Sequence, residues 1–342
     1  MTLALRSYLF VYLFCLALSL GSLANLMLHQ LTGGRWGVAL RGPLSAAASL
    51  LPVVALFSLP LLIDLPAVFA WIGDPASVAD KHWWLNRPFF LARSAVYLVL
   101  WSLMSLRWRV LAARAASPRS RALIRFSAAG LIAYGFSVSL ASVDWIMSLT
   151  PQWYSSTFGL WVGVAAMQAA LALAVCAHIG PLAWSALRGD AGTRTALQSA
   201  PLRELCGDLG NLLLMYVLGL TYLSYTQYLI VWAEDLPKEI SWYLPRLQTD
   251  WRNVTVALVL LQFIAPFLLL LVRGVKRDAR YLAAIAAALL FAQLLLFFYL
   301  VKPAFMPAGL ALHWSDPLLV LVCVGAWLLA WRQRWQPAAA GS

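Results

Sequence analysis

The residues of this chain that could do chemistry gather in one short stretch around Asp144. This carboxylate ends a run of eighteen uncharged residues, it is followed by tryptophans, a proline and hydroxyl groups, and the next charge is Arg188. An ionisable group at the edge of an apolar segment is costly, so it marks a candidate functional site. The alternative is an interfacial loop in which Asp144 caps a helix. Trp145, Trp153 and Tyr154 would then anchor the chain at the membrane surface.

A site of this composition could take up and release protons. Burial disfavours the charged form of a carboxyl group, so a dehydrated Asp144 could load and release a proton. A second loop, around residues 80–93, adds a histidine and an arginine at the start of another apolar segment. The candidate site therefore comprises Asp144, Trp145, Trp153, Tyr154, His82 and Arg93.

The composition identifies the class of protein that must position these residues. The chain is 63% hydrophobic and 11% charged, and its mean hydropathy is +0.79, which excludes an ordinary soluble domain. Apolar runs of about twenty residues recur to the C-terminus, so the sequence predicts an all-α, polytopic membrane protein rather than a signal peptide followed by a soluble domain. The net charge of +12 follows alternate loops, which favours membrane topology over nucleic-acid binding.

Nine transmembrane spans are predicted within a single membrane domain. They cover roughly 8–31, 43–66, 89–106, 122–143, 157–187, 209–233, 252–272, 280–301 and 315–331. Pro52, Pro60 and Pro66 in the second span predict a kink or break near its outer end. Similar aromatic and proline-rich turns after spans two, four and six suggest two four-helix units, residues 1–150 and 151–303, followed by a peripheral segment, 304–342. Enrichment of aromatic residues at the membrane surface explains those turns nearly as well.

The distribution of Lys and Arg predicts the orientation. One set of alternate loops, with the C-terminal tail, holds 17 of the 25 basic residues, and the other set holds 8. The positive-inside rule then places the C-terminus in the cytoplasm and the N-terminus outside. We therefore expect the N-terminus and the Asp144 stretch to lie on the outer, periplasmic side of the membrane.

Several classes of site are excluded by missing motifs. Cys15, Cys176 and Cys323 lie in apolar spans, Cys206 lies in an inner loop, and the sequence contains no C-x-x-C or C-x-x-C-H motif. Iron–sulfur and covalent haem ligation by this chain are therefore not expected, and no metal site is predicted. The sequence also has no phosphate-binding glycine loop, dinucleotide fingerprint or nucleophile elbow.

Several separated motifs, in order over roughly residues 10–303, resemble one family of membrane subunits. They are Ser142-Val143-Asp144-Trp145-Ile146-Met147-Ser148-Leu149, Pro151 and Trp153-Tyr154-Ser155; Asp80-Lys81, Leu85-Asn86, Phe90 and Arg93; Gln227-Tyr228-Leu229-Ile230, Trp232, Pro237, Trp242-Tyr243 and Arg246; and Phe263 with Pro266-Phe267. The family is the second quinone-binding subunit of bacterial alternative complex III, a quinol:cytochrome c oxidoreductase. Its wider superfamily is the polysulfide-reductase-type (NrfD-like) membrane anchor.

The resemblance implies two four-helix bundles with peripheral helices, in a respiratory subunit that carries no redox centre of its own. Its implied partners are a paralogous NrfD-like subunit, an iron–sulfur protein and c-type cytochromes, which hold the clusters and haem c. The chain itself would bind only quinone or quinol. A helix that many members have ahead of the bundles is expected to be missing, since only Met1–Ser7 precede the first predicted span.

The resemblance leaves three roles open: quinone binding, proton translocation and structural support. In the quinol-active paralogue, histidine is typical at the position of Tyr154, and many relatives have histidine where Gln152 stands. Proton conduction would use polar groups within the spans; the candidates are Asp64, Ser139, Gln168, His178, Tyr222, Tyr225 and Gln227. Interhelical hydrogen bonding is the alternative for each of them. Two further functions fit parts of the pattern: a b-haem anchor using His29 and His178, and a stand-alone secondary transporter.

Overall fold

The computed structural model describes residues 2–114, 120–188, 192 and 197–335, and within these ranges it contains helices and no strand. Nine helices of the described chain are long and apolar enough to cross a membrane, and each coincides with one of the nine predicted spans. The all-α, polytopic fold is therefore confirmed. The crossing segments are Thr2–Thr32, Arg35–Leu62, Arg87–Arg114, Arg121–Leu149, Phe158–Leu187, Ala200–Glu234, Trp251–Leu271, Ala279–Ala304 and Ser315–Arg334.

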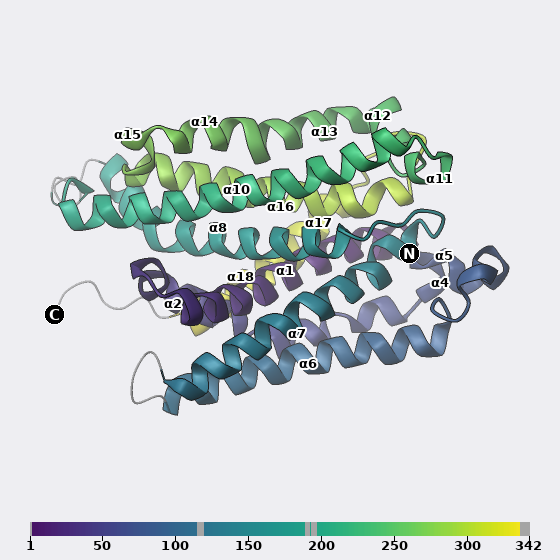
Figure 1. The fold of residues 1–342 in the computed structure, drawn as a ribbon, viewed down its shortest axis with the longest axis horizontal. Helices are drawn as coiled ribbons and strands as arrows, with labels where there is room; N and C mark the ends of the chain where they lie inside the picture. The colour runs from purple at the N-terminus through teal and green to yellow at the C-terminus, as the bar shows by residue number, and fades with distance from the viewer. Residues whose placement is uncertain (1, 115–119, 189–191, 193–196, 336–342) are drawn as a thin grey trace.

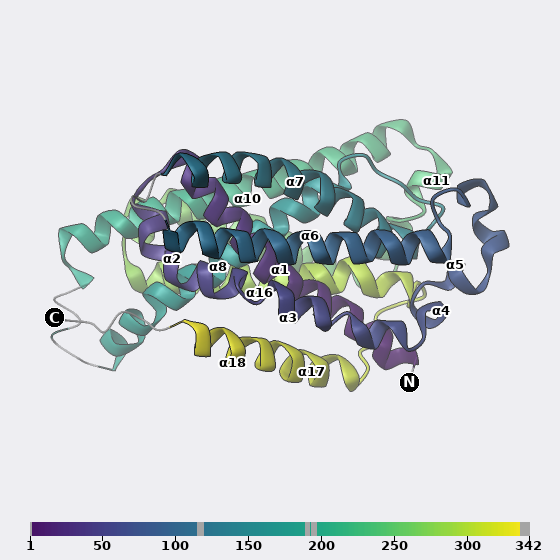
Figure 2. The same cartoon turned by 90° about the horizontal axis from the view of Figure 1, so that it is seen from below.

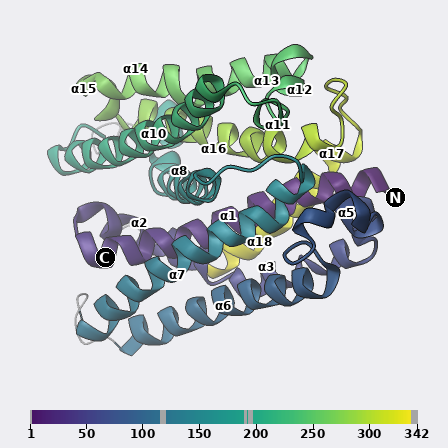
Figure 3. The ribbon, with the colours of Figure 1, turned by 45° about the vertical axis from the view of Figure 1, so that its right-hand side comes forward.

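The first four spans pack together as a group (Figure 3). They are α1 (Thr2–Thr32), the broken second span, α6 (Arg87–Arg114) and α7 (Arg121–Trp145). The second span divides at its prolines, as the sequence predicts, because proline removes a helical hydrogen bond. Its pieces are α2 (Arg35–Ala48), α3 (Leu51–Leu56), η1 (Leu59–Leu62) and α4 (Leu65–Val68), followed by α5 (Ala70–Gly73) and η2 (Pro75–Lys81).

The next four spans form the second group. They are α8 (Phe158–Leu187), α10 (Ala200–Glu234), a composite seventh span and α16 (Ala279–Val301). The seventh span runs through α13 (Trp251–Leu258), the π-helical segment η4 (Val259–Ile264) and α14 (Ala265–Leu271). Short helices in the connections are η3 (Met147–Leu149), α11 (Pro237–Ile240), α12 (Leu244–Gln248), α15 (Arg273–Lys276) and η5 (Lys302–Ala304).

The two groups meet where α1 packs against α8. At Gly21 a Cβ atom would lie only 2.0 Å from the Ala166 carbonyl oxygen, so the helices touch backbone to backbone there. Small residues permit this close approach between membrane helices. Asn25 adds a polar link, because its amide donates to the Met167 carbonyl oxygen at 2.8 Å and its oxygen accepts from the Tyr216 hydroxyl at 2.7 Å. This link joins α1, α8 and α10.

The last span lies at the edge of the bundle (Figure 2). It comprises α17 (Ser315–Leu319), the π-helical segment η6 (Val320–Val324) and α18 (Gly325–Arg334). The Trp327 indole donates to Ser19 Oγ on α1 at 2.9 Å. A buried ion pair, Lys302 Nζ to Asp316 Oδ1 at 2.9 Å, fixes the other end of this span. The peripheral position predicted for the ninth helix thus rests on specific polar contacts.

Connections at one end of the bundle hold the residues singled out by the sequence. The N-terminus lies at this end, together with α4, α5 and α11, whereas α15 lies at the opposite end (Figure 1). We call the first the Asp144 end and the second the basic end. The Asp144 end comprises the connections 63–86, 146–157, 235–250 and 302–314.

Candidate functional site

Asp144 and Arg93 form a buried ion pair between α7 and α6. The Arg93 Nε and Nη2 atoms donate to the two carboxylate oxygens of Asp144 at 2.9 and 2.7 Å. Asp144 is 0% exposed and Arg93 is 8% exposed. A bidentate arginine–carboxylate pair is among the stronger charge-assisted contacts. The guanidinium therefore compensates a carboxylate charge that has no access to solvent.

Two more donors complete the shell around the Asp144 carboxylate. The Trp84 indole nitrogen donates to Oδ1 at 3.0 Å, and the Tyr97 hydroxyl donates to Oδ2 at 2.9 Å. With the two Arg93 contacts, the carboxylate accepts four hydrogen bonds, which is about its full capacity. An oxygen so occupied offers no free lone pair to a new proton donor. The geometry thus favours a fixed ionic anchor over a proton acceptor.

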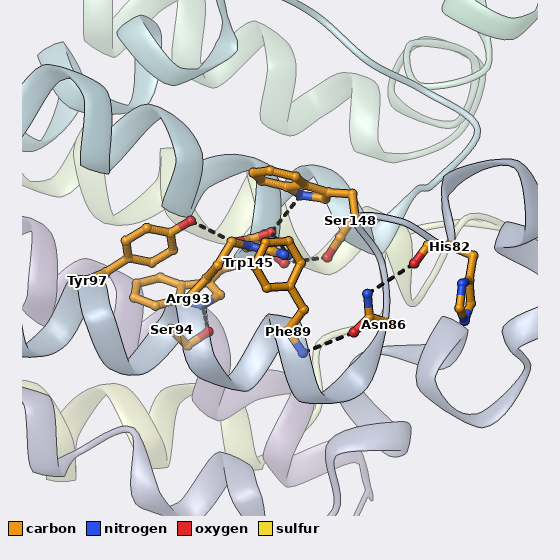
Figure 4. Close-up of polar contacts among 10 residues, drawn as sticks. His82, Asn86, Phe89, Arg93, Ser94, Tyr97, Trp145 and Ser148 are labelled. Carbon is orange, nitrogen blue, oxygen red and sulfur yellow. Dashed lines mark hydrogen bonds and ion pairs between the residues drawn. The ribbon is translucent and has the colours of Figure 1, made fainter.

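The Arg93 guanidinium is enclosed by aromatic rings. Its Cζ atom lies 4.0 Å from the centroid of Trp84 and 4.2 Å from the centroid of Phe89. Cation–π contacts of this kind strengthen when water is excluded. The Nη1 atom is buried without a hydrogen-bond partner among the described residues. Figure 4 shows the Arg93 side chain close to the ring of Phe89.

Helical spacing on α6 produces this arrangement. Phe89, Arg93, Tyr97 and Trp101 follow one another at intervals of four residues, so they share one face of the helix. That face is turned to α7, because the Trp101 indole donates to Ser137 Oγ at 2.8 Å.

The start of α6 is fixed by Asn86. Its side-chain oxygen accepts from the Phe89 backbone N–H at 3.0 Å, and its amide nitrogen donates to the His82 carbonyl oxygen at 3.1 Å (Figure 4). An asparagine in this position satisfies one of the free N–H groups of the first helical turn. Asn86 therefore fixes where α6 begins, and so determines which α6 residues share the face that starts at Phe89.

Asp144 does not cap a helix, so the interfacial-cap interpretation is not what the structure shows. The residue occupies the last turn of α7, where the helix dipole is unfavourable for a negative charge. Its side chain turns to α6 instead, and its backbone carbonyl oxygen accepts from the Ser148 hydroxyl. Arg93 supplies the positive charge that this position requires.

A cavity of about 330 Å³ lies beside the ion pair inside the first group of helices. Trp145 and Ser94 line it, and the Trp145 indole donates to Ser94 Oγ at 2.9 Å. Tyr12 also lines it, and its buried hydroxyl interacts with the Ser58 side chain. Leu59 at the rim is 54% exposed, so the cavity opens on the flank of the bundle. We call this the first cavity.

The structure brings together three of the six predicted site residues, Asp144, Trp145 and Arg93. Trp153 lies in the second group, where its ring stacks on Trp242 with centroids 4.9 Å apart.

The other two predicted residues face away from the ion pair. Tyr154 is 60% exposed, and its ring lies 5.8 Å from Lys81 Nζ. The His82 side chain is exposed, and its ring lies apart from Arg93 in Figure 4. Neither residue contributes to the carboxylate shell.

Trp84 and Tyr97 are the site residues that sequence reasoning missed. Helical spacing could have identified Tyr97, because it lies one turn after Arg93 on the same helical face. No such spacing identifies Trp84, since it reaches Asp144 from the loop before α6 and loop geometry is not encoded by periodicity. Its backbone N–H donates to the Lys81 carbonyl oxygen at 2.9 Å, which holds the loop in a tight turn.

Lys81 joins two loops at the Asp144 end. Its ammonium group donates to the Pro151 carbonyl oxygen in the loop that follows Asp144. Partial burial, with a smaller contribution from the positive charge of Lys238, lowers the pKa of Lys81. The loop before α6 is therefore held against the loop that follows Asp144.

The seven candidate proton-path residues lie in separate groups, and no chain of hydrogen bonds among the described residues links them; the seven are Asp64, Ser139, Gln168, His178, Tyr222, Tyr225 and Gln227. Asp64 caps α4 by accepting from the Ala67 backbone N–H at 3.2 Å. Ser139 donates to the Gly135 carbonyl oxygen within its own helix at 2.7 Å. His178 is half-buried on α8, toward the basic end.

Gln168 belongs to a triad of glutamines in the second group. Its side-chain oxygen accepts from Gln262 at 2.6 Å and from Gln293 at 2.9 Å, and Gln293 also donates to Gln262 at 2.8 Å. The three residues come from α8, η4 and α16. Such contacts join helices in a membrane, which is the alternative role that the sequence left open.

The remaining candidates lie toward the Asp144 end of α10. Gln227 donates to the Tyr243 hydroxyl at 3.3 Å and accepts from the Ser155 hydroxyl at 3.3 Å. Tyr222 and Tyr225 are exposed on the flank of α10. Gln227 thus links α10 to the connections that contain Ser155 and Tyr243. The two tyrosines border a second, larger cavity.

The ring of His29, one of the two histidines considered as haem ligands, is already held by other contacts. The Nε2 atom of His29 lies 3.0 Å from the Gly34 carbonyl oxygen, and the ring packs edge-on against Trp36. A ring held in this way is poorly placed to serve as an axial haem ligand. Within the described ranges, no group of three or more His, Cys, Asp or Glu residues could hold a metal ion.

Comparison of the sequence with models of known protein families returned no match, and a search of curated proteins returned none either.

Proposed function

We propose that this chain is a membrane subunit of a respiratory quinol:electron-acceptor oxidoreductase of the alternative-complex-III type. It supports quinol oxidation, or the proton conduction coupled to it, without a redox centre of its own. Electrons pass to partner subunits with iron–sulfur clusters and c-type haems. The motif resemblance motivates this assignment, and the first cavity beside the Arg93–Asp144 pair is the observation that carries it.

The first cavity has the features that a quinol ring requires. Aromatic side chains, among them Trp145 and Phe90, form part of its wall, and its opening on the flank of the bundle faces the region that lipid would occupy. The Tyr12 and Ser58 side chains, which interact with each other in the cavity wall, present hydroxyl groups to a ring oxygen. The ion pair behind Trp145 holds α6 against α7 and so keeps this wall in place.

In this proposal Asp144 positions the site rather than taking the quinol proton. Its four hydrogen bonds leave no room for the quinol, and it does not line the cavity. Tyr12 is the ionisable side chain that does line it, in company with the Ser58 and Ser94 hydroxyls. The two protons released when a quinol gives up two electrons would therefore leave through these hydroxyl groups or through a partner subunit.

Purification from native membranes tests the assembly. A tagged chain should co-purify with a c-type cytochrome, an iron–sulfur protein and a second polytopic subunit. A chain that purifies alone and catalyses substrate-coupled flux in vesicles would instead be a secondary transporter. A haemochromogen spectrum from the isolated chain would support the b-haem anchor.

A bulky substitution at the rim of the first cavity tests the site. Leu59→Trp should reduce quinol-dependent turnover per assembled complex by about tenfold, the equivalent of about 1.4 kcal/mol, because the indole obstructs entry of the ring. The matched control is Leu268→Trp on α14, which is similarly exposed but lies away from the cavity. Equal turnover in the two assembled variants would remove the first cavity from the proposal.

The proposed location is the bacterial inner membrane, with the Asp144 end periplasmic. A reporter fused after Arg334 should then read as cytoplasmic, in agreement with the excess of basic residues at the other end of the bundle. A periplasmic reading would reverse the orientation and place the ion pair on the cytoplasmic side.

A further inference from the structure

A second and larger cavity, of about 710 Å³, lies in the second group of helices. It is bounded by α8, α10, α13, η4, α16 and the connection that contains α12. Of its 18 lining residues eight are aromatic, and none carries a charge. This volume falls within the range of pockets that hold small organic molecules, about 300–1,000 Å³.

The cavity opens on the flank of the bundle within the membrane-spanning part of α10. Tyr222 and Tyr225 at its mouth are 67% and 59% exposed, and Leu218 beside them is 44% exposed. On the opposite side of the mouth, Val259 begins the π-helical segment η4. A ligand would therefore enter from the lipid and not from water.

A few polar groups interrupt the aromatic walls. The Thr221 hydroxyl is buried and makes no hydrogen bond to the described residues. Tyr299 lies deeper, and its hydroxyl accepts from Thr255 at 3.3 Å. A buried hydroxyl without a partner costs free energy unless a ligand or water satisfies it. A bound molecule that carries an oxygen acceptor would do so.

A positive charge lies behind the inner wall. The Arg246 guanidinium carbon is 3.5 Å from the Trp242 ring centroid and 5.2 Å from that of Tyr299, and both rings line the cavity. Its hydrogen bonds go to the carbonyl oxygens of Trp242 and Tyr299, at 2.6 and 3.3 Å. No carboxylate of the described chain pairs with it. The positive charge of Arg246 therefore acts through the Trp242 and Tyr299 rings and favours a ligand oxygen such as a ring carbonyl, although no charged group lines the cavity.

We propose that this second cavity binds the ring of a quinone-class lipid, at a site separate from the first cavity. The uncharged lining disfavours an anionic headgroup, and the aromatic walls with an unsatisfied hydroxyl suit a flat ring with oxygen substituents. The exposed mouth lets an isoprenoid tail remain in the lipid. The site depends only on residues of this chain, so its existence does not require the proposed respiratory assembly.

Photoaffinity labelling of the full chain in phosphatidylcholine vesicles tests this site. An azidoquinone with an isoprenoid tail should label residues 218–228 and 242–263, and excess unlabelled quinone should displace it. Leu218→Trp should reduce labelling of these segments by on the order of tenfold, or about 1.4 kcal/mol. Labelling near the first cavity should not change in this variant. Leu268→Trp, exposed on α14 away from both cavities, is the matched control.

Three results would overturn the inference. The first is equal labelling of the two segments in wild type and Leu218→Trp. The second is labelling that excess quinone does not displace. The third is equally strong labelling of the same segments by a photoreactive phosphatidylcholine, which would identify ordinary lipid as the occupant. Failure of Leu59→Trp to lower turnover bears on the first cavity alone, so the two proposals can fail separately.

Discussion

Each group of helices buries one arginine at the Asp144 end, and the two arginines are neutralised in different ways. Arg93 packs against Trp84 and meets the carboxylate of Asp144 at 2.7 Å. Arg246 packs against Trp242, is 2% exposed, and has only backbone carbonyl oxygens as hydrogen-bond acceptors in the described chain. A tryptophan ring thus packs on each arginine, but Arg93 is paired with a carboxylate whereas Arg246 is a cation without one among the described residues.

The difference relates to what each arginine holds in place. Arg93 joins two transmembrane helices directly, which fixes α6 against α7 at this end. Arg246 instead joins the α12 connection to the end of α16 through main-chain oxygens. Its aromatic partners remain free to line a cavity on their other face. Burial lowers the pKa of Arg246 to about 10, which records the absence of a neighbouring carboxylate.

Removal of the carboxylate in the first group should have the largest effect. Asp144→Asn leaves the Arg93 charge buried and unpaired, so we expect a loss of about 3–5 kcal/mol in the free energy of unfolding. Denaturant-driven unfolding of the detergent-solubilised chain measures this. The yield of any assembled complex should fall with it, more than turnover per complex.

The double variant Arg93→Met with Asp144→Leu is the control for that loss. It removes both charges at similar volume, and such replacements are often neutral or stabilising. The double variant should therefore be more stable than Asp144→Asn. A single variant as stable as wild type would show that the pair is not the anchor that its geometry indicates.

Loss of one neutral donor to the same carboxylate should have an intermediate effect. Tyr97→Phe keeps the ring that packs on Trp101 and Trp145 but deletes a hydrogen bond to Asp144, at a cost of about 1.5–3 kcal/mol. Tyr134→Phe is matched, because that buried hydroxyl donates to the uncharged Gly163 carbonyl oxygen. Its expected cost is about 0.5–1.5 kcal/mol. Equal losses in thermal unfolding would mean that the carboxylate gives Tyr97 no special role.

Sequence periodicity predicted the spans well because lipid imposes a simple rule. A segment must be about twenty apolar residues long and must satisfy its own backbone hydrogen bonds, so length and hydropathy alone identify it. The breaks at Pro52 and Pro60 followed from the missing N–H of proline. The π-helical turn at Val259–Ile264 did not, because it depends on how Gln262 meets the glutamines of two other helices.

The candidate site was harder to predict because it depends on rotation of helices and on loops. The rarity of charge within the spans identified Asp144 and Arg93, yet nothing in the sequence showed that they face each other. Trp153 lies nine residues after Asp144 but belongs to the other group of helices. The Lys302–Asp316 pair was missed altogether, since both charges lie beside a connection that reads as surface.

Removal of the cation in the second group should have the smallest effect at neutral pH, and its effect should depend on pH. Arg246→Met deletes a buried charge without leaving an anion behind, at the cost of two hydrogen bonds to carbonyl oxygens. We expect stability within about 2 kcal/mol of wild type at pH 8, in contrast to the larger loss in Asp144→Asn.

The sign of the pH dependence follows from the pKa of Arg246, about 10 in the folded chain and lower than the ordinary value of 12.5. Between these two values the unfolded chain holds one more proton than the folded chain, so wild-type stability should rise with pH in that window. The burial cost is fully present below pH 10 and is relieved above it, with a slope of at most about 1.4 kcal/mol per pH unit. Arg246→Met should lack this component when unfolding is compared between pH 8 and 11. Parallel profiles for the two proteins would show that the Arg246 charge is compensated by an acceptor outside the described chain, and the contrast between the two arginines would disappear.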